Sequence, residues 1–328
     1  MPIRKINRHI KNNSSNSEKT GPIVESSINI KEKNDKNNNF YIENPKYSFE
    51  DIILPENILS SMKDVIYSKK YNKKVFDEWG LSKVLPHSGN KLAVNLYGPP
   101  GTGKTMAAHV IANELGKKLL CMNYADIESK YVGETAKNLE NAFKFAKEND
   151  LVLFFDEADA MLSKRVSNMN NSTDVSVNQT RSVLLMLMND YEEIIIFATN
   201  FINNFDEAFM RRIHFHIKFE LPNEEIREIL WEKYIPSEMP NNANIKELAK
   251  NYESVSGSDI SNAVMTAALK AARLEKSYVE NQYFHESIKN IIDSKRENKG
   301  NSNVTISERF VSKEYAKSQL NIEGRSNK

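Results

Sequence analysis

Short apolar runs alternate with amphipathic segments through the middle of the chain. The runs predict strands at 92–97, 118–123, 151–155 and 194–199, and the last two are continuously apolar, as in strands buried on both faces. Apolar residues spaced three or four positions apart predict helices at 104–115, 135–149 and 181–191. Residues 214–221 alternate apolar and polar side chains, which is typical of a strand nearer the edge of a sheet.

Strands and helices follow one another in turn, which predicts an α/β fold with a parallel sheet, right-handed crossovers and helices on both faces. After residue 222 the pattern changes, and 226–293 show one helical pattern after another without a strand. We therefore expect a large α/β subdomain over 45–222 and a smaller, all-helical subdomain over 223–293.

The two ends of the chain differ from this middle part in composition. Residues 1–44 are rich in Asn, Lys and Ser, and residues 294–328 are similarly polar. Such segments bury too little apolar surface to offset the entropy of ordering, so both are expected to be disordered.

Charge and cysteine content narrow the class of protein. The formal net charge is +1 over 328 residues, so no overall attraction to nucleic acid or to an anionic membrane is expected. The single cysteine, Cys121, excludes an intramolecular disulfide and favours a reducing compartment. No apolar run is long enough to span a membrane, and the first residues lack the apolar segment of a secretory signal. These features predict a cytoplasmic protein without a membrane partner.

The stretch GPPGTGKT lies between the first predicted strand and the first predicted helix, and it fits the phosphate-loop pattern Gly-x4-Gly-Lys-Thr. Glycines allow backbone N–H groups to turn toward phosphate oxygens, and the start of a helix favours negative charge. We expect Lys104 to reach the outer phosphates of a nucleotide and the Thr105 hydroxyl to hold Mg²⁺. The loop residues are Gly98, Pro99, Pro100, Gly101, Thr102, Gly103, Lys104 and Thr105.

Polar residues directly follow the last two apolar runs, at 151–155 and 194–199. LVLFF ends in Asp156-Glu157, where one carboxylate can hold Mg²⁺ and the other can activate water as a general base. An acidic pair after a strand is also a common helix N-cap, but the preceding phosphate loop favours the catalytic role. The run at 194–199 ends in Asn200, whose amide is placed to orient the attacking water, although turns also favour asparagine.

With these motifs in order, the chain resembles the AAA ATPases, a branch of the AAA+ superfamily, over about residues 45–280. NLYGPPGTGKTMAAHVIANEL resembles the family's Walker A segment, FFDEADAMLSKR its Walker B segment, ending in Arg165, and ATN its sensor 1. SGSDISNAVMTAALKAA is similar to the family's lid helix. The chain holds one such module and no His-Glu-x-x-His stretch, and FDEWGLSKVLP is most similar to a bacterial subgroup.

The resemblance implies a P-loop NTPase sheet with a helical lid, and ATP and Mg²⁺ as cofactors. It adds nucleotide contacts outside the loop, at Asp51, Ile52, Met106, Gly257 and Ser258. Leu54 stands where the family usually has glycine in the segment that faces the adenine.

FDEAFMRR resembles the family's segment whose arginines reach the γ-phosphate in a neighbouring subunit. Arg211 and Arg212 are adjacent here, as in the severing ATPases spastin and katanin, and either can be the arginine finger. The alternative is a solvated basic pair beside a strand, since exposed arginine is ordinary. A finger supplied by a neighbour completes the site only between subunits, so the resemblance implies a ring, a homo-hexamer.

In the family, the segment after the second strand lines the pore of the ring, with the pattern basic, aromatic, aliphatic, glycine. Lys130, Tyr131, Val132 and Gly133 match that pattern. An exposed aromatic side chain can grip an extended polypeptide by apolar contact without reading its sequence. The alternative is that Tyr131 and Val132 pack on their own domain, as large apolar side chains usually do.

The function that the resemblance implies is ATP hydrolysis coupled to remodelling, unfolding or disassembly of protein substrates. One alternative is a non-threading assembly factor, for example for a phage-tail-like contractile injection system, which some members of the bacterial subgroup accompany. Another is a nucleic-acid motor or loader, for which the lysines and aromatics of SKKYNKKVF are the best support. The arm over 1–44 is a candidate segment for binding an adaptor, and the alternative is that it is only a tether.

Overall fold

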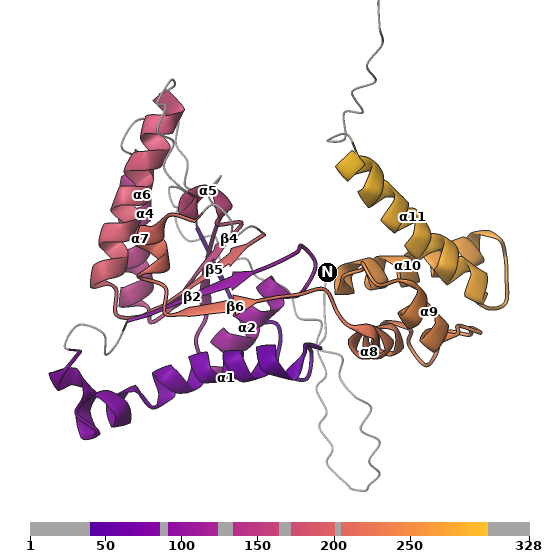
Figure 1. Ribbon diagram of the computed structural model, residues 1–328, viewed down its shortest axis with the longest axis horizontal. Coiled ribbons are helices and arrows are strands. Elements are labelled where there is room, and N and C mark those ends of the chain that lie inside the picture. The colour runs from indigo at the N-terminus through magenta and orange to yellow at the C-terminus, as the bar shows by residue number, and fades with distance from the viewer. Residues whose placement is uncertain (1–39, 86–90, 124–133, 164–171, 201–204, 301–328) are drawn as a thin grey trace, which may run out of the picture.

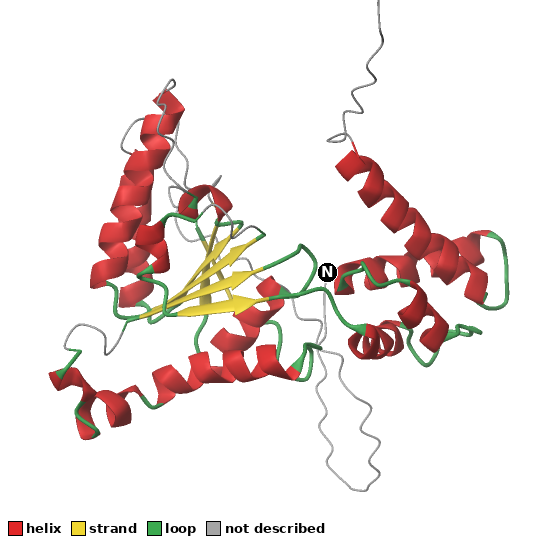
Figure 2. Ribbon diagram, in the orientation of Figure 1, coloured by secondary structure: helices red, strands yellow, loops and turns green. Residues whose placement is uncertain are grey.

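The computed structural model describes residues 40–85, 91–123, 134–163, 172–200 and 205–300. Within them, a sheet flanked by helices forms one part of the molecule, and the helices labelled α8 to α11 form a second part beside it (Figure 1). We call this second part the helical region. Figure 2 shows that the strands are confined to the first part, so the described residues have the expected order of α/β part and helical part.

The described strands form one sheet in the order β1-β3-β4-β5-β2-β6. They are β1 Tyr41–Glu43, β2 Leu92–Tyr97, β3 Leu119–Asn123, β4 Val152–Asp156, β5 Ile194–Thr199 and β6 Phe215–Lys218. The pairs from β3 to β6 are parallel, with Tyr97 opposite Thr199 and Asn123 opposite Asp156. This register brings the carboxyl ends of the central strands to one edge, where parallel sheets usually bind ligands.

Each face of the sheet has its own apolar core. The helices of this part are α1 Glu56–Lys70, α2 Lys104–Glu114, α4 Glu134–Glu148, α5 Asp159–Leu162, α6 Ser172–Asp190 and α7 Glu207–Met210. Val94 and Ile196 lie in the core beneath α1 and α2, whereas Phe155 and Phe197 stack in the core beneath α4 and α6. Burial on both faces explains why the central strands are continuously apolar.

A short extension follows α1 at the lower left of Figure 1. It consists of the π-helical turn η1 Lys74–Glu78 and the 3-10 turn η2 Leu81–Lys83. Trp79 between them is 70% exposed, and the Lys74 ammonium group lies 5.5 Å from the centre of its ring. The extension therefore adds exposed aromatic surface rather than core.

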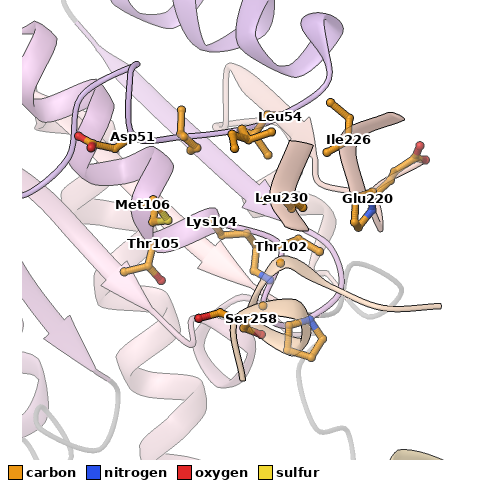
Figure 3. A pocket seen from close by; sticks show the side chains of 18 of the residues that line it. Asp51, Leu54, Thr102, Lys104, Thr105, Met106, Glu220, Ile226, Leu230 and Ser258 are labelled. Carbon is orange, nitrogen blue, oxygen red and sulfur yellow. The ribbon is translucent and has the colours of Figure 1, made fainter. Parts of the chain in front are cut away.

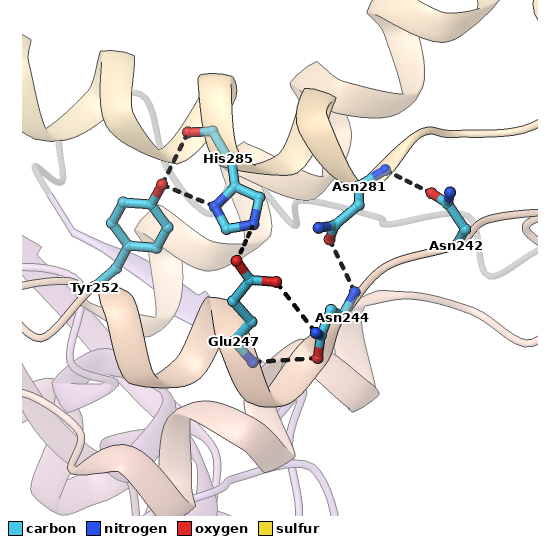
Figure 4. A network of polar contacts seen from close by, with 6 residues as sticks. All are labelled: Asn242, Asn244, Glu247, Tyr252, Asn281 and His285. Atoms are coloured by element: carbon cyan, nitrogen blue, oxygen red, sulfur yellow. Dashed lines mark hydrogen bonds and ion pairs between the residues drawn. The ribbon is translucent and has the colours of Figure 1, made fainter.

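The helical region has a core of its own. Its helices are α8 Glu224–Tyr234, α9 Ile245–Asn251, α10 Gly257–Arg273 and α11 Asn281–Gly300. Trp231 and Phe284 meet edge to face at its centre, with ring centroids 6.2 Å apart. Polar contacts tie α9 to α11 at the surface, where the Tyr252 hydroxyl lies 3.0 Å from His285 Nδ1 and the Asn244 N–H donates to Asn281 Oδ1 (Figure 4).

Two of the boundaries expected between parts of the chain, at residues 44 and 293, differ in the structure. Strand β1 lies inside the arm predicted over 1–44, and it pairs antiparallel with β3 through Tyr41 opposite Cys121, so the sheet is not wholly parallel. A strand of three residues is too short to show an alternating pattern in the sequence. It forms because its backbone pairs with β3. Helix α11 runs to Gly300, beyond the expected end of the helical part at 293. Among the described residues, no helix is long and apolar enough to cross a membrane.

Candidate nucleotide-binding and catalytic site

A cavity of about 470 Å³ opens between the carboxyl edge of the sheet and the helical region (Figure 3). This volume lies in the range of small-molecule sites. Two of the predicted loop residues, Gly98 and Pro99, are not in its lining. The predicted residues that line it are Asp51, Ile52, Pro100, Gly101, Thr102, Gly103, Lys104, Thr105, Met106, Asp156, Glu157, Asn200, Gly257 and Ser258.

The loop between β2 and α2 requires glycine at two close approaches. Gly98 has a φ of 144°, and a Cβ there would lie 1.9 Å from the carbonyl oxygen of Phe219. Gly101 has a φ of 75°, and a Cβ there would lie 2.0 Å from Ser258 Oγ. Side chains rarely adopt such backbone angles, and at both positions they would also collide with a neighbour. The glycines therefore let the loop touch the end of β6 on one side and α10 on the other.

Lys104 begins α2 and is 8% exposed. Its ammonium group donates to the carbonyl oxygens of Gly98 and Pro99 at 2.8 and 2.9 Å and to Asn200 Oδ1 at 3.0 Å. Burial lowers the pKa of Lys104 from its ordinary value, and two nearby carboxylates oppose that shift. Phosphate oxygens are stronger acceptors for a buried ammonium group than these neutral oxygens, so the lysine could hold a phosphate group in this cavity.

Thr105 and Asp156 come from different elements and meet in the cavity. The Thr105 hydroxyl donates to Asp156 Oδ2 at 3.1 Å. Hydroxyl and carboxylate oxygens suit Mg²⁺, which commonly takes one or two protein ligands and completes its shell with water and phosphate oxygens. No group of three or more His, Cys, Asp or Glu side chains in the described residues is arranged to hold a metal alone. The pair therefore fits a magnesium ion shared with a nucleotide.

Glu157 follows Asp156 and is exposed in the same cavity. Its N–H donates to Asp156 Oδ1 at 2.9 Å, which holds the turn after β4. Its φ is 51°, in the left-handed region that non-glycine residues seldom adopt. Strained backbone of this kind often marks functional positions, and here it lets two successive carboxylates line one cavity.

Asp159 is not among the predicted site residues, yet it fixes the end of β5. Its Oδ1 accepts a hydrogen bond from the Asn200 N–H at 3.1 Å and another from the Thr199 hydroxyl. Asn200 is thereby held with its side-chain oxygen on Lys104. The sequence signal was weak, because Asp159 is one more acidic residue in an acidic segment.

The helical region supplies the opposite wall of the cavity. Ser258 N–H donates to the Gly101 carbonyl oxygen at 3.3 Å, at the start of α10. Ile226 and Leu230 of α8 add apolar surface (Figure 3). Lys233 donates to the Asp51 carbonyl oxygen at 2.5 Å, which ties the segment before α1 to α8.

The residues of α8 are also absent from the predicted site. Ile226, Leu230 and Tyr234 recur every fourth position, and this apolar spacing was their only signal. Leu54, which stands where the family usually has glycine, lines the cavity beside Asp51.

Comparison with known proteins agrees with this geometry. The sequence model of the ATPase family associated with various cellular activities (AAA) matches residues 94–221. That span contains the phosphate loop, Asp156-Glu157 and Asn200. The chain contains a AAA ATPase domain.

Three curated proteins illustrate the similarity. The chain is 32% identical over 260 residues to a proteasome-activating nucleotidase of Methanococcus maripaludis, covering 77% of this chain and 62% of that protein. It is 32% identical over 241 residues to Cell division protein C of Sulfolobus acidocaldarius, covering 70% and 61%. It is 34% identical over 207 residues to the ATP-dependent zinc metalloprotease FtsH of Lachnoclostridium phytofermentans, covering 61% and 36%. The chain thus spans less than two thirds of the length of each.

The two adjacent arginines of the AAA domain have different surroundings. Arg212 Nε donates to Asn189 Oδ1 at 2.8 Å and its Nη1 to the Ala208 carbonyl oxygen at 2.9 Å, so its own domain holds it. The Arg211 side chain is 79% exposed, with its guanidinium 3.5 Å from the exposed carboxylate of Glu207. Neither arginine lines the cavity of its own chain.

Some predicted residues of the AAA domain lie outside the described residues. They are the pore-loop residues Lys130, Tyr131, Val132 and Gly133, and Arg165 at the end of the Walker B segment.

Proposed function

We propose that this chain binds ATP with Mg²⁺ and hydrolyses it to ADP and phosphate. One observation carries the proposal: a single cavity holds the buried Lys104, the Thr105–Asp156 pair and, beside that pair, the exposed Glu157. Relatives of the AAA domain that are named as a nucleotidase and as an ATP-dependent protease support the same activity.

In this proposal, Lys104 and the N–H groups of the loop bind phosphate oxygens. Asn200, which already contacts Lys104, orients the attacking water, and Glu157 accepts a proton from it. Thr105 and Asp156 would hold Mg²⁺, which would supply positive charge to the phosphate oxygens. Positioning and charge stabilisation of this kind supply most of the catalysis in phosphoryl transfer.

The test is Glu157→Gln, which removes the base and keeps the shape of the side chain. We expect ATP turnover to fall by at least about 100-fold while ATP binding persists, because general-base catalysis contributes on that scale. Glu220→Gln is the matched control, since Glu220 lines the same cavity without a proposed role. Turnover that survives Glu157→Gln, or falls equally in both variants, would contradict the assignment.

We also propose that residues 45–222 and 223–293 act as a catalytic subdomain and its lid, and that the chain works as a homo-hexameric ring. Arg211 is the proposed finger, because it is exposed while internal hydrogen bonds hold Arg212. A finger that reaches a neighbour's site must extend from the surface of its own domain, and the exposure of Arg211 supports this choice between the two arginines.

Complementation tests the ring directly. Arg211→Ala chains keep Glu157, and Glu157→Gln chains keep Arg211, so a mixed ring contains some complete sites. We expect two inactive preparations to regain ATP turnover on mixing. A finger that acts within its own chain predicts no recovery, and so does a chain that stays monomeric with ATP, which size-exclusion chromatography of the Glu157→Gln protein detects.

We further propose that turnover drives remodelling or unfolding of a protein substrate. Support comes from relatives whose names refer to the proteasome and to proteolysis, and from the pore-loop pattern at 130–133. Tyr131→Ala should abolish remodelling of a trapped substrate and leave ATP turnover intact. Remodelling that is unchanged in this variant would favour the non-threading assembly factor.

A nucleic-acid motor is the weaker alternative, because internal contacts engage two lysines of the basic segment SKKYNKKVF, at the end of α1. Lys69 lies 3.2 Å from Glu193, and Lys70 lies 3.7 Å from Glu114. These contacts leave less charge for phosphate contacts along a strand. DNA-stimulated turnover that falls steeply with salt would revive this alternative.

A further inference from the structure

Lys295, near the end of α11, contacts the start of α10. Lys295 Nζ lies 2.5 Å from Asp259 Oδ2. Asp259 is 5% exposed, whereas the lysine side chain is 45% exposed. A surface cation therefore neutralises a carboxylate that is almost wholly buried.

Asp259 belongs to the capping box of α10. Its Oδ2 accepts hydrogen bonds from the Ser256 N–H at 2.7 Å and from the Ser256 hydroxyl at 2.8 Å. A capping box fixes the direction in which the chain enters a helix. The same carboxylate oxygen thus sets the first turn of α10 and receives Lys295.

That first turn of α10 rests on the phosphate loop. Ser258 N–H donates to the Gly101 carbonyl oxygen at 3.3 Å. A Cβ on Gly101 would lie 2.0 Å from Ser258 Oγ and 2.6 Å from Ser256 Oγ, so the two backbones are in close approach. Contacts therefore run without a gap from Lys295 through Asp259 and Ser256 to Gly101.

We propose that Lys295 is a positioning residue for nucleotide binding, which cancels the charge of Asp259 in the capping box and so holds the first turn of α10 against the phosphate loop. The inference rests on the proposed ATP-binding function of the cavity. Removing the lysine leaves an uncompensated charge on the buried carboxylate. Here the carboxylate belongs to the capping box that sets the first turn of α10, so the uncompensated charge would disturb the contact of that turn with Gly101 and oppose ATP binding.

The pair is not needed to hold α11 onto α10, because other contacts do so. Ile260 and Ile288 lie in the shared apolar core, and a second ion pair, Lys270–Glu286, joins the same two helices farther along α10. Lys270 does not line the cavity. Lys270→Met is therefore a matched control for a loss of stability between α10 and α11 alone.

The test measures binding of a fluorescent ATP analogue and steady-state turnover by the full chain. We expect Lys295→Met to raise Kd and KM about tenfold, within the range found for residues that couple to a site through contacts, with kcat within about twofold of the parent. Lys295→Arg should restore the parent affinity, and Lys270→Met should leave Kd unchanged. Equal losses in Lys295→Met and Lys270→Met would overturn the proposal.

A double variant separates charge from packing and also guards against misfolding. Asp259→Asn combined with Lys295→Met removes both charges, so it should bind the analogue more tightly than Lys295→Met alone. A double variant no better than the single one would refute the electrostatic explanation. Failure of the parent chain itself to bind the analogue would instead refute the proposed function, so the two failures are distinguishable.

Discussion

The two walls of the cavity are built differently. The wall formed by the phosphate loop and the strand ends concentrates charge, with Lys104 held by carbonyl and amide oxygens and Thr105 hydrogen-bonded to Asp156. The wall formed by the helical region supplies apolar side chains of α8 and a capped helix start that touches Gly101. In the proposed function, the first wall carries out the chemistry and the second wall shapes the cavity around the nucleotide. Substitutions of the proposed catalytic groups in the first wall should act mainly on kcat, whereas substitutions in the second wall, or at its contact with the first, should act mainly on KM.

The largest expected effect tests whether a third surface, from a neighbouring chain, completes the first wall. Arg211→Ala should lower kcat by about a thousandfold or more, because an arginine finger stabilises charge in the transition state. Arg212→Ala should instead lower the free energy of unfolding by about 1–3 kcal/mol, because its hydrogen bonds to Asn189 and Ala208 are internal. Steady-state turnover and urea unfolding separate the two effects. The reverse assignment follows if Arg212→Ala alone abolishes turnover in a fully folded protein.

The second prediction concerns the contact between the two walls. Gly101→Ala places a Cβ at a left-handed position against Ser258 Oγ. A left-handed alanine costs about 1–2 kcal/mol, so the loop should relax away from its binding shape and ATP affinity should fall about tenfold. Gly116→Ala is the control, since Gly116 has a φ of 65° but no atom within 4 Å of an added Cβ. If both variants lose affinity alike, the close approach to α10 is irrelevant to binding.

A smaller effect is expected where the helical wall holds the segment before α1. Lys233→Met removes the hydrogen bond to the Asp51 carbonyl oxygen and should raise KM for ATP by about two- to fivefold, with kcat unchanged. Lys250→Met, at an exposed lysine of α9, is the control. A fall in kcat without a change in KM would contradict the expectation that the helical wall acts mainly on KM.

The smallest expected effect is a loss of stability at acid pH in the sheet part, which distinguishes it from the helical region. Burial lowers the pKa of His109, His214 and His216, all of which lie in the sheet part. As pH falls, these histidines are protonated at a higher pH in the unfolded chain than in the folded chain. The free energy of unfolding therefore keeps its full value above about pH 6.5, the ordinary histidine pKa, and declines below it. We expect the urea midpoint of the sheet part to drop between pH 7.5 and 5.5. His216→Gln should shrink that drop, and a pH-independent midpoint would contradict the expectation.

Local pattern was sufficient for the parts of the fold whose causes are local. The apolar runs match the bounds of β2 and β5, and GPPGTGKT places its loop between β2 and α2 as expected, because burial and turn chemistry act over a few residues. The roles of the two arginines could not be separated by pattern, since Asn189, which holds Arg212, is 23 positions away.

The residues missed at the site share a different cause. Lys295 contacts Asp259 across 36 positions, Asp159 contacts Asn200 across 41, and Lys233 contacts Asp51 across 182. Each of these residues lies in an ordinary local sequence, and its contact forms only when segments far apart in the chain come together. Strand β1 belongs to the same group, because three residues of the arm predicted over 1–44 form a strand only by pairing with β3.

The left-handed backbone of Glu157 has an evolutionary consequence. Glycine or asparagine would adopt a φ of 51° at lower cost, so Glu157→Gly or Glu157→Asn should relax the turn after β4 and resist heat better than the parent. Selection for stability alone would therefore favour losing the proposed general base. A lineage released from the need to hydrolyse ATP is expected to change this position early and to keep the surrounding sheet.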